Sequence, residues 1–110
     1  MEHTPLLAVV VVGGPEQLVE ATKRVAELVA NALVVTADVK AAATQIARIR
    51  PCAIIISDEI YAFDSAEFDA LARDVQAELI SVTTDGGSVR ALQHELTPRI
   101  MDAFRDYFKN

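Results

Sequence analysis

The feature that most constrains this fold is a series of short apolar segments, each followed by helical sequence. The segments are rich in β-branched residues and are Leu6–Val12, Leu33–Ala37, Ala53–Ser57 and Leu79–Thr83. Strands that alternate with helices pair in parallel, and parallel strands are buried on both faces. The hydrophobic fraction of 52% agrees with such burial. We therefore predict an α/β domain with a four-stranded parallel sheet.

The order of the strands follows from the handedness of the connections. Right-handed crossovers favour the order 2-1-3-4 with helices on both faces, which is a three-layer α/β/α sandwich. A chain of 110 residues is long enough for one core, so residues 1–110 are expected to form a single domain. The fourth strand is then an apolar edge, and we expect the terminal helix or another chain to cover it.

Residues that start and stop helices divide the second half of the chain. Asp58–Phe63 is expected to be a loop, and Asp64 and Glu67 are expected to form a capping box for the helix that follows. Thr97-Pro98 is interpreted as a new helix start, because proline is tolerated in a first helical turn. This gives a separate terminal helix at residues 98–108, a candidate oligomerisation element.

Composition and charge exclude several classes of function. A net charge of −6 argues against nucleic-acid binding, which needs basic surfaces. No apolar run approaches the roughly 20 residues of a membrane span, and Met1-Glu2-His3 lacks the basic start of a signal peptide. We expect a cytoplasmic chain without metal or cofactor. Its one cysteine, Cys52, is expected to be an inert core thiol.

Polar or glycine residues stand at the ends of all four predicted strands. They are Gly13-Gly14, Asp38, Ser57-Asp58-Glu59 and Thr83-Thr84-Asp85, and sites in parallel sheets gather at the carboxyl ends of strands. With the segment Arg50–Asp58 and the strand spacing, this pattern resembles the receiver domain of bacterial two-component response regulators over about residues 6–96. The resemblance implies a flavodoxin-like fold and a role in signalling.

Several positions depart from the receiver pattern. Receivers carry an acidic pair after strand one, a phosphorylated aspartate after strand three, a Ser or Thr after strand four and a lysine after strand five. Here the acids are replaced by Gly13-Gly14, Ser57 stands at the acceptor position with Asp58 one residue beyond, and the fifth strand and its lysine are missing. Thr83 fits the Ser/Thr position. Because phosphoryl transfer needs a metal held by carboxylates, we predict a pseudo-receiver that is not an enzyme.

Two other functions remain open from the sequence. The first is a phosphorylatable receiver with Asp58 as acceptor and Thr83 as the switch hydroxyl. The second is a small-ligand or nucleotide site, because the amides of the Gly13-Gly14 turn could hold an anion. Glu16 opposes that site by its charge, and neither glycine-rich nucleotide fingerprint is present.

The aromatic residues all follow the third strand, and most are candidates for a contact surface. The candidates are Tyr61, Phe63, Phe104, Tyr107 and Phe108. In receivers, the surface around the fourth helix, fifth strand and fifth helix is the usual partner face. We therefore expect a homodimer or other protein partner to contact the fourth strand, the helices after it and the segment that bears Tyr61 and Phe63.

Overall fold

The computed structural model describes residues 7–85 and 87–109, and it contains a parallel sheet of four strands in the order β2-β1-β3-β4. The strands are β1 (Ala8–Val12), β2 (Leu33–Ala37), β3 (Ala53–Ser57) and β4 (Glu78–Val82). The predicted fold class and strand order are confirmed. Leu6, at the start of the first expected strand, lies outside the described residues.

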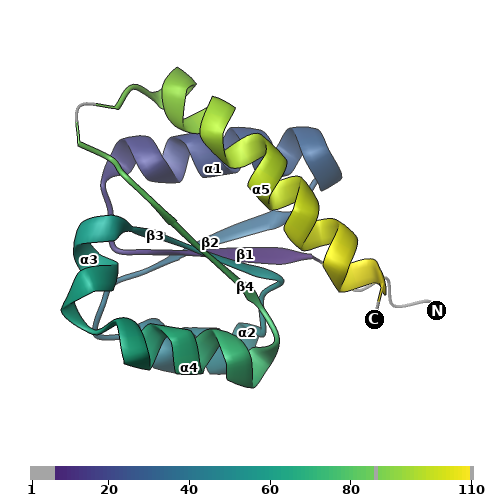
Figure 1. The fold of residues 1–110 in the computed structure, drawn as a ribbon. Coiled ribbons are helices and arrows are strands. Elements are labelled where there is room, and N and C mark those ends of the chain that lie inside the picture. Colours follow the sequence, from purple (N-terminus) through teal and green to yellow (C-terminus); the bar gives the residue numbers. More distant parts are fainter. Residues whose placement is uncertain (1–6, 86, 110) are drawn as a thin grey trace.

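Helices cover both faces of the sheet (Figure 1). The helices are α1 (Glu16–Ala30), α2 (Ala42–Ile49), α3 (Asp58–Phe63), α4 (Ser65–Val75) and α5 (Val89–Lys109). Helices α1 and α5 lie together on one face, and α2, α3 and α4 lie on the other. None of the helices in the described part of the chain is both long and apolar enough to cross a membrane.

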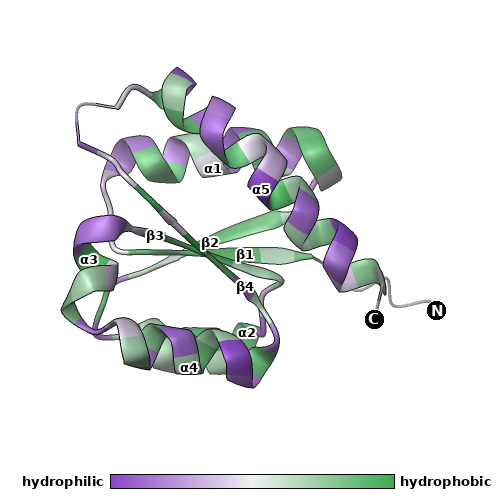
Figure 2. Ribbon diagram, in the orientation of Figure 1, coloured by the Kyte–Doolittle hydropathy of each residue, from purple (hydrophilic) through white to green (hydrophobic). Residues whose placement is uncertain are grey.

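The core consists of two apolar layers, one on each face of the sheet. Successive side chains of a strand point to opposite faces, so Val9 and Ile55 pack beneath α1 and α5, whereas Val10 and Ile54 pack against α2 and α4. Both central strands are buried at every residue. Figure 2 shows that the central strands are mainly apolar, whereas the helices that cover the sheet carry both apolar and polar residues.

Leu28 corrects one detail of the first helix. Its spacing from Ala21 and Val25 predicts an inward side chain, but Leu28 is 80% exposed while the other two are buried. Asn31 ends the helix as expected, in a left-handed conformation.

The segment Asp58–Phe63 is a helix and not the loop that we expected. Ser57 caps it, because its Oγ accepts a hydrogen bond from the Ile60 N–H at 3.3 Å. The chain thus passes from β3 into α3 without a connecting loop. The expected capping box at Asp64 and Glu67 is also wrong, since the Asp64 side chain makes no capping bond to α4.

The predicted break at Thr97-Pro98 is also wrong, because α5 runs unbroken through Pro98. The Thr97 hydroxyl donates to the Gln93 carbonyl one turn earlier, at 2.7 Å. That is the bond of a threonine inside a helix and not of a cap. The expected terminal helix at residues 98–108 is therefore the second half of one long helix that packs along α1.

One face of the edge strand β4 is covered by helices of its own chain. Ile80 and Val82 lie in the core layer beneath α1 and α5. From α5, the Arg99 guanidinium donates to the Ser81 carbonyl at 2.9 Å. This places a positive charge at the open side of β4.

Candidate functional site

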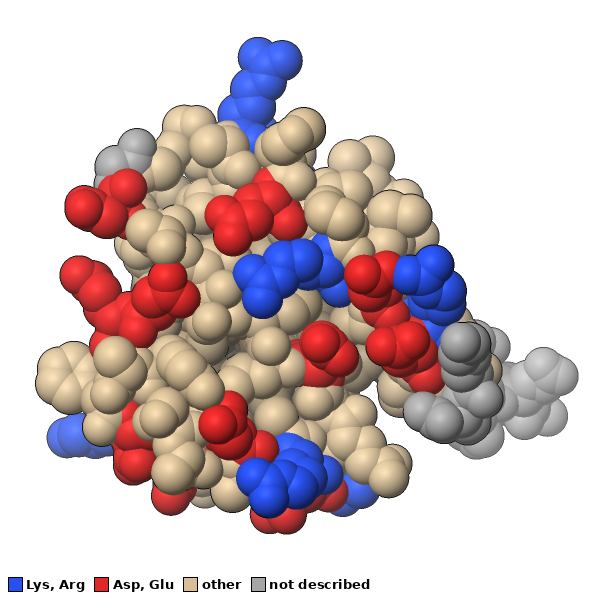
Figure 3. Space-filling model, in the orientation of Figure 1, with Lys and Arg blue, Asp and Glu red and all other residues tan. Residues whose placement is uncertain are grey.

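The residues singled out from the sequence meet at one end of the sheet, which we call the carboxyl edge. Gly13, Asp58 and Thr83 each follow directly after a strand, and the parallel register keeps the ends of β1, β3 and β4 close together. This edge lies beside α3, on the left of Figure 1. Acidic side chains gather there in Figure 3, and Asp58, Glu59 and Asp85 are exposed.

The carboxylate of Asp58 is in contact with the hydroxyl of Thr83. The Thr83 Oγ1 donates to Asp58 Oδ2 at 2.6 Å, and both residues are exposed. Asp58 is also the first residue of α3, where a negative charge is favoured by the helix dipole. Asp58 and Thr83, which would be the acceptor and the switch hydroxyl of a phosphorylatable receiver, are thus brought together across 25 positions of sequence.

Ser57, which stands at the acceptor position, caps helix α3. It is 3% exposed, and its hydroxyl caps α3. Because the helix starts immediately after it, Asp58 does not continue the strand but turns toward β4 and Thr83.

Gly13 is covered by an apolar side chain. Its φ is +73°, and a Cβ there would fall closer to Ile60 Cδ1 than real Cβ atoms approach a neighbour. Its N–H donates to the Ala37 carbonyl at 2.7 Å. Where a receiver holds acids, this chain therefore has Ile60 lying over the end of β1. The sequence signal for it was an apolar residue two places after Asp58, in a segment that we had assigned to a loop.

The carboxylates near this edge are not arranged as metal ligands. Asp38, which follows β2, caps the turn before α2 by accepting from the Ala41 N–H at 2.8 Å. Within residues 7–85 and 87–109, no group of three or more His, Cys, Asp or Glu side chains is placed to hold a metal ion. Magnesium requires several oxygens in near-octahedral geometry, and Asp58 alone does not supply them.

The turn at Gly13-Gly14 offers few amides to an anion. The Gly13 N–H is already bonded to β2, and Pro15 has no N–H. The Pro15 carbonyl accepts from the amides of Leu18 and Val19 at 3.0 and 3.3 Å, which closes the first turn of α1.

Two of the candidate contact aromatics lie on α3. The Tyr61 hydroxyl donates to Asp69 Oδ1 at 2.8 Å and ties α3 to α4. This hydrogen bond and the negative charge of Asp69 raise the pKa of Tyr61. Phe63 is 89% exposed beside a hollow between α2, α3 and α4 whose apolar lining includes Val39 and Leu71.

The three candidate aromatic residues of α5 do not form one contact surface. Phe104 is 4% exposed and belongs to the core layer under α1 and α5, so our expectation that it lies on a contact surface is wrong. Tyr107 and Phe108, one turn later, are exposed. Their rings pack edge to face, and the ring centroids are 5.8 Å apart.

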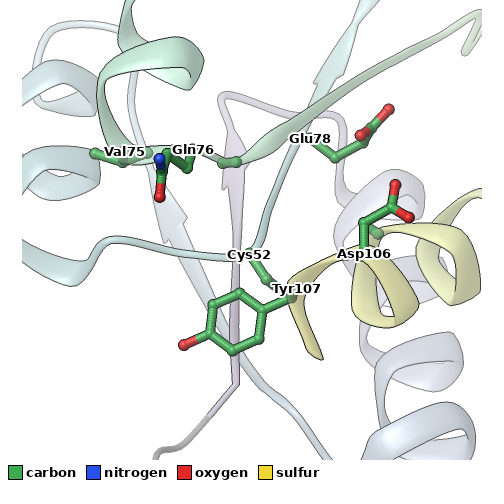
Figure 4. A pocket seen from close by; sticks show the side chains of 8 residues that line it. Cys52, Val75, Gln76, Glu78, Asp106 and Tyr107 are labelled. Atoms are coloured by element: carbon green, nitrogen blue, oxygen red, sulfur yellow. The ribbon is translucent and has the colours of Figure 1, made fainter. Parts of the chain in front are cut away.

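A second hollow lies at the opposite, amino end of β3 and β4 (Figure 4). Glu78 and Asp106 present carboxylates on one side of it, and Tyr107 directs its hydroxyl away from them. Cys52 lies deeper, is 3% exposed, and directs its thiol to the Ala8 carbonyl at 3.4 Å. Burial raises the pKa of this thiol to about 11, so it stays protonated at neutral pH and is no nucleophile.

Cys52 makes stability depend on alkaline pH. The folded chain keeps the thiol proton up to about pH 11, whereas the ordinary pKa of this thiol is 9.0. The stability that the protonated thiol contributes is therefore complete below pH 9 and is lost as the pH rises toward 11. We expect the wild type to lose about 2 kcal/mol more than Cys52→Ala over this interval. Urea unfolding at pH 8 and pH 11 measures the difference, and equal losses in the two proteins would contradict it.

Comparison with known proteins leaves this arrangement without a match: no family model, no curated protein and no solved structure is similar to the chain.

Proposed function

We propose that this chain is a non-catalytic, receiver-like signalling module of the cytoplasm that acts through protein–protein contact, including contact with a second copy of itself. The observation that carries the proposal is the side chain of Ile60 packed against Gly13 at the carboxyl edge. Ile60 lies over the position where a phosphate-handling receiver needs metal-binding acids. A metal must neutralise charge between an aspartate and an incoming phosphoryl group.

The hydrogen bonds at this edge also support the proposal. The Ser57 hydroxyl holds the start of α3, and the Asp58 carboxylate accepts from Thr83. Both groups therefore have structural tasks that explain their presence without any reaction.

Exposed apolar side chains support the binding role. Phe63 and Val39 are 89% and 50% exposed on either side of the apolar hollow between α2, α3 and α4. Exposed aromatic residues beside a hollow are typical of the centres of protein contacts.

Exposure to Mg²⁺ and acetyl phosphate tests the absence of phosphotransfer. We expect the intact mass of the protein to remain unchanged, because the carboxylates in the described part of the chain are not grouped to hold a metal ion beside Asp58. Asp58→Asn serves as the matched control, since it removes the candidate acceptor carboxylate and keeps a side chain of similar size. A phosphoryl adduct in the wild type that is absent from Asp58→Asn would overturn the proposal.

A phosphorylatable receiver is the second candidate, and the contact of 2.6 Å between Thr83 and Asp58 favours it. In this function Asp58 accepts the phosphoryl group and Thr83 then donates to the phosphate. The adduct would form in the wild type and in Thr83→Ala, but only the wild type would change its partner affinity.

A nucleotide or flavin site at the Gly13-Gly14 turn is a third candidate that rests on the sequence alone. A rise in the thermal midpoint with any such ligand would support it.

A further inference from the structure

Strand β2 forms an edge of the sheet, and no strand, proline or charged residue of its own protects this edge in the part of the chain that the structure describes. It pairs with β1 on one side, and among the described residues no strand pairs with it on the other. Its sequence, Leu-Val-Val-Thr-Ala, contains no charge, proline or glycine. Leu33 is 51% exposed and Thr36 is also exposed. Open, apolar edges of this kind are templates for pairing with another strand.

The backbone pattern identifies which groups are available. The Leu33 N–H donates to the Leu7 carbonyl at 2.8 Å, and the Ala37 carbonyl accepts from Gly13 at 2.7 Å, so both residues direct their backbone toward β1. Backbone groups of successive strand residues point to opposite sides. Val34 and Thr36 therefore direct their N–H and C=O groups outward, to the open edge.

The opposite edge of the sheet is guarded. By the same alternation, the Glu78 N–H donates to the carbonyl of Cys52, which directly precedes β3, and the backbone of Ser81 faces outward. Arg99 occupies that side by donating to the Ser81 carbonyl. A charged side chain on an edge strand opposes pairing, so the two edges of this sheet differ in their capacity to accept another strand.

We propose that β2 pairs antiparallel with β2 of a second copy, which joins the two sheets into one. This deepens the proposed self-association and moves its surface from β4 to β2. A two-fold axis at Val35 places Val34 of each copy opposite Thr36 of the other, and the outward N–H and C=O groups of both residues then bond reciprocally. An antiparallel pair of identical strands is self-complementary, as a two-fold interface requires.

Charges beside the strand fit the same two-fold arrangement. Lys23 and Glu27 lie one turn apart on α1, and both line the hollow beside Leu33 and Val34 at this edge. Helix α1 runs antiparallel to its partner across the axis, so Lys23 of one copy faces Glu27 of the other, and the reverse pair forms as well. Opposite charges thus meet twice, although the whole chain carries a net charge of −6.

Sedimentation of edge variants tests the pairing. Thr36→Pro removes an outward N–H and places a ring on the open edge, while the bonds to β1 remain. The matched control is Ser81→Pro, which makes the same change at an outward position of β4. We expect a dimeric wild type, a dimeric Ser81→Pro, and a dissociation constant at least about tenfold higher for Thr36→Pro.

A charge exchange on α1 gives a second test of the pairing, in which the sequence of β2 is unchanged. Lys23→Glu should raise the dissociation constant about threefold, since acids then face each other. Adding Glu27→Lys to it should restore the wild-type value. Circular dichroism verifies that each variant is folded.

The outcomes separate this inference from the proposed function. If the wild type is a dimer and both proline variants dimerise equally, or if the charge exchange does not restore affinity, the β2 pairing is wrong and the self-association stands. If the wild type is a monomer at high micromolar concentration, both the self-association and the pairing are wrong. The mass measurement with acetyl phosphate tests the lack of phosphotransfer independently of either result.

Discussion

Phe104→Ala should lower the free energy of unfolding by about 3–5 kcal/mol, the usual cost of removing a buried phenylalanine. Phe104 is 4% exposed and packs with Leu96 and Ile100 in the layer between α5 and the sheet. The substitution leaves a cavity in this layer, which holds the long α5 against the rest of the domain. Urea denaturation followed by circular dichroism measures the loss.

Phe108→Ala is the matched control for this substitution. Phe108 is 71% exposed one turn further along the same helix, and surface substitutions usually change stability by within about 0.5 kcal/mol. Equal losses in the two variants would contradict the placement of Phe104 in the core.

Gly13→Val should destabilise the domain by about 2–4 kcal/mol. A φ of +73° is unfavourable for any residue with a Cβ, and most of all for a β-branched one. The new side chain also meets Ile60 over the end of β1, and overpacking adds to the strain. Thermal and urea unfolding give the change in free energy.

Two companion variants separate the causes of the Gly13 effect. Gly87→Val is the control, because Gly87 has no positive φ and its nearest neighbours lie at the ordinary contact distance of 3.7 Å. We expect it to cost about 1 kcal/mol or less. Ile60→Ala in the Gly13→Val background should recover part of the loss. If the double variant is no more stable than additivity predicts, Ile60 does not cover Gly13.

The fold was predictable where short-range patterns decide it. The four short apolar runs of β-branched residues, each followed by helical sequence, indicate strands of a parallel sheet, and the handedness of crossovers then favours their order. The helix boundaries in the second half of the chain were not predictable, because the side-chain hydrogen bonds that set them can form in two different local structures. Thr97 can cap a helix or bond one turn back within it, and Ser57 can end a strand or cap α3.

Burial along a helix also depends on its length relative to the sheet. Phe104, Tyr107 and Phe108 lie on one side of α5 by periodicity, but only Phe104 belongs to the core layer, and the other two are exposed. Leu28 of α1 is exposed as well, although Val29 beside it packs against the core. Periodicity gives the direction of a side chain and not whether another element reaches it.

The candidate site was predictable in position but not in its contacts. The parallel sheet alone implies that Gly13, Asp58 and Thr83 share an edge. The contacts of the site depend on the chain passing directly from β3 into α3. This brings Asp58 to Thr83 and places Ile60 over Gly13. The direct passage depends on the cap made by Ser57, which sequence reasoning had assigned to the acceptor position.

The claim that the carboxyl edge has no working metal site is tested most directly by a titration with Mg²⁺. The amide NMR signals of Gly13, Asp58 and Thr83 are monitored during the titration. We predict no saturable shift at these residues, because Ile60 lies beside Gly13 and the described part of the chain places no group of three or more His, Cys, Asp or Glu side chains to hold a metal ion. A saturable shift centred on Asp58, and abolished in Asp58→Asn, would show a working metal site and contradict the account.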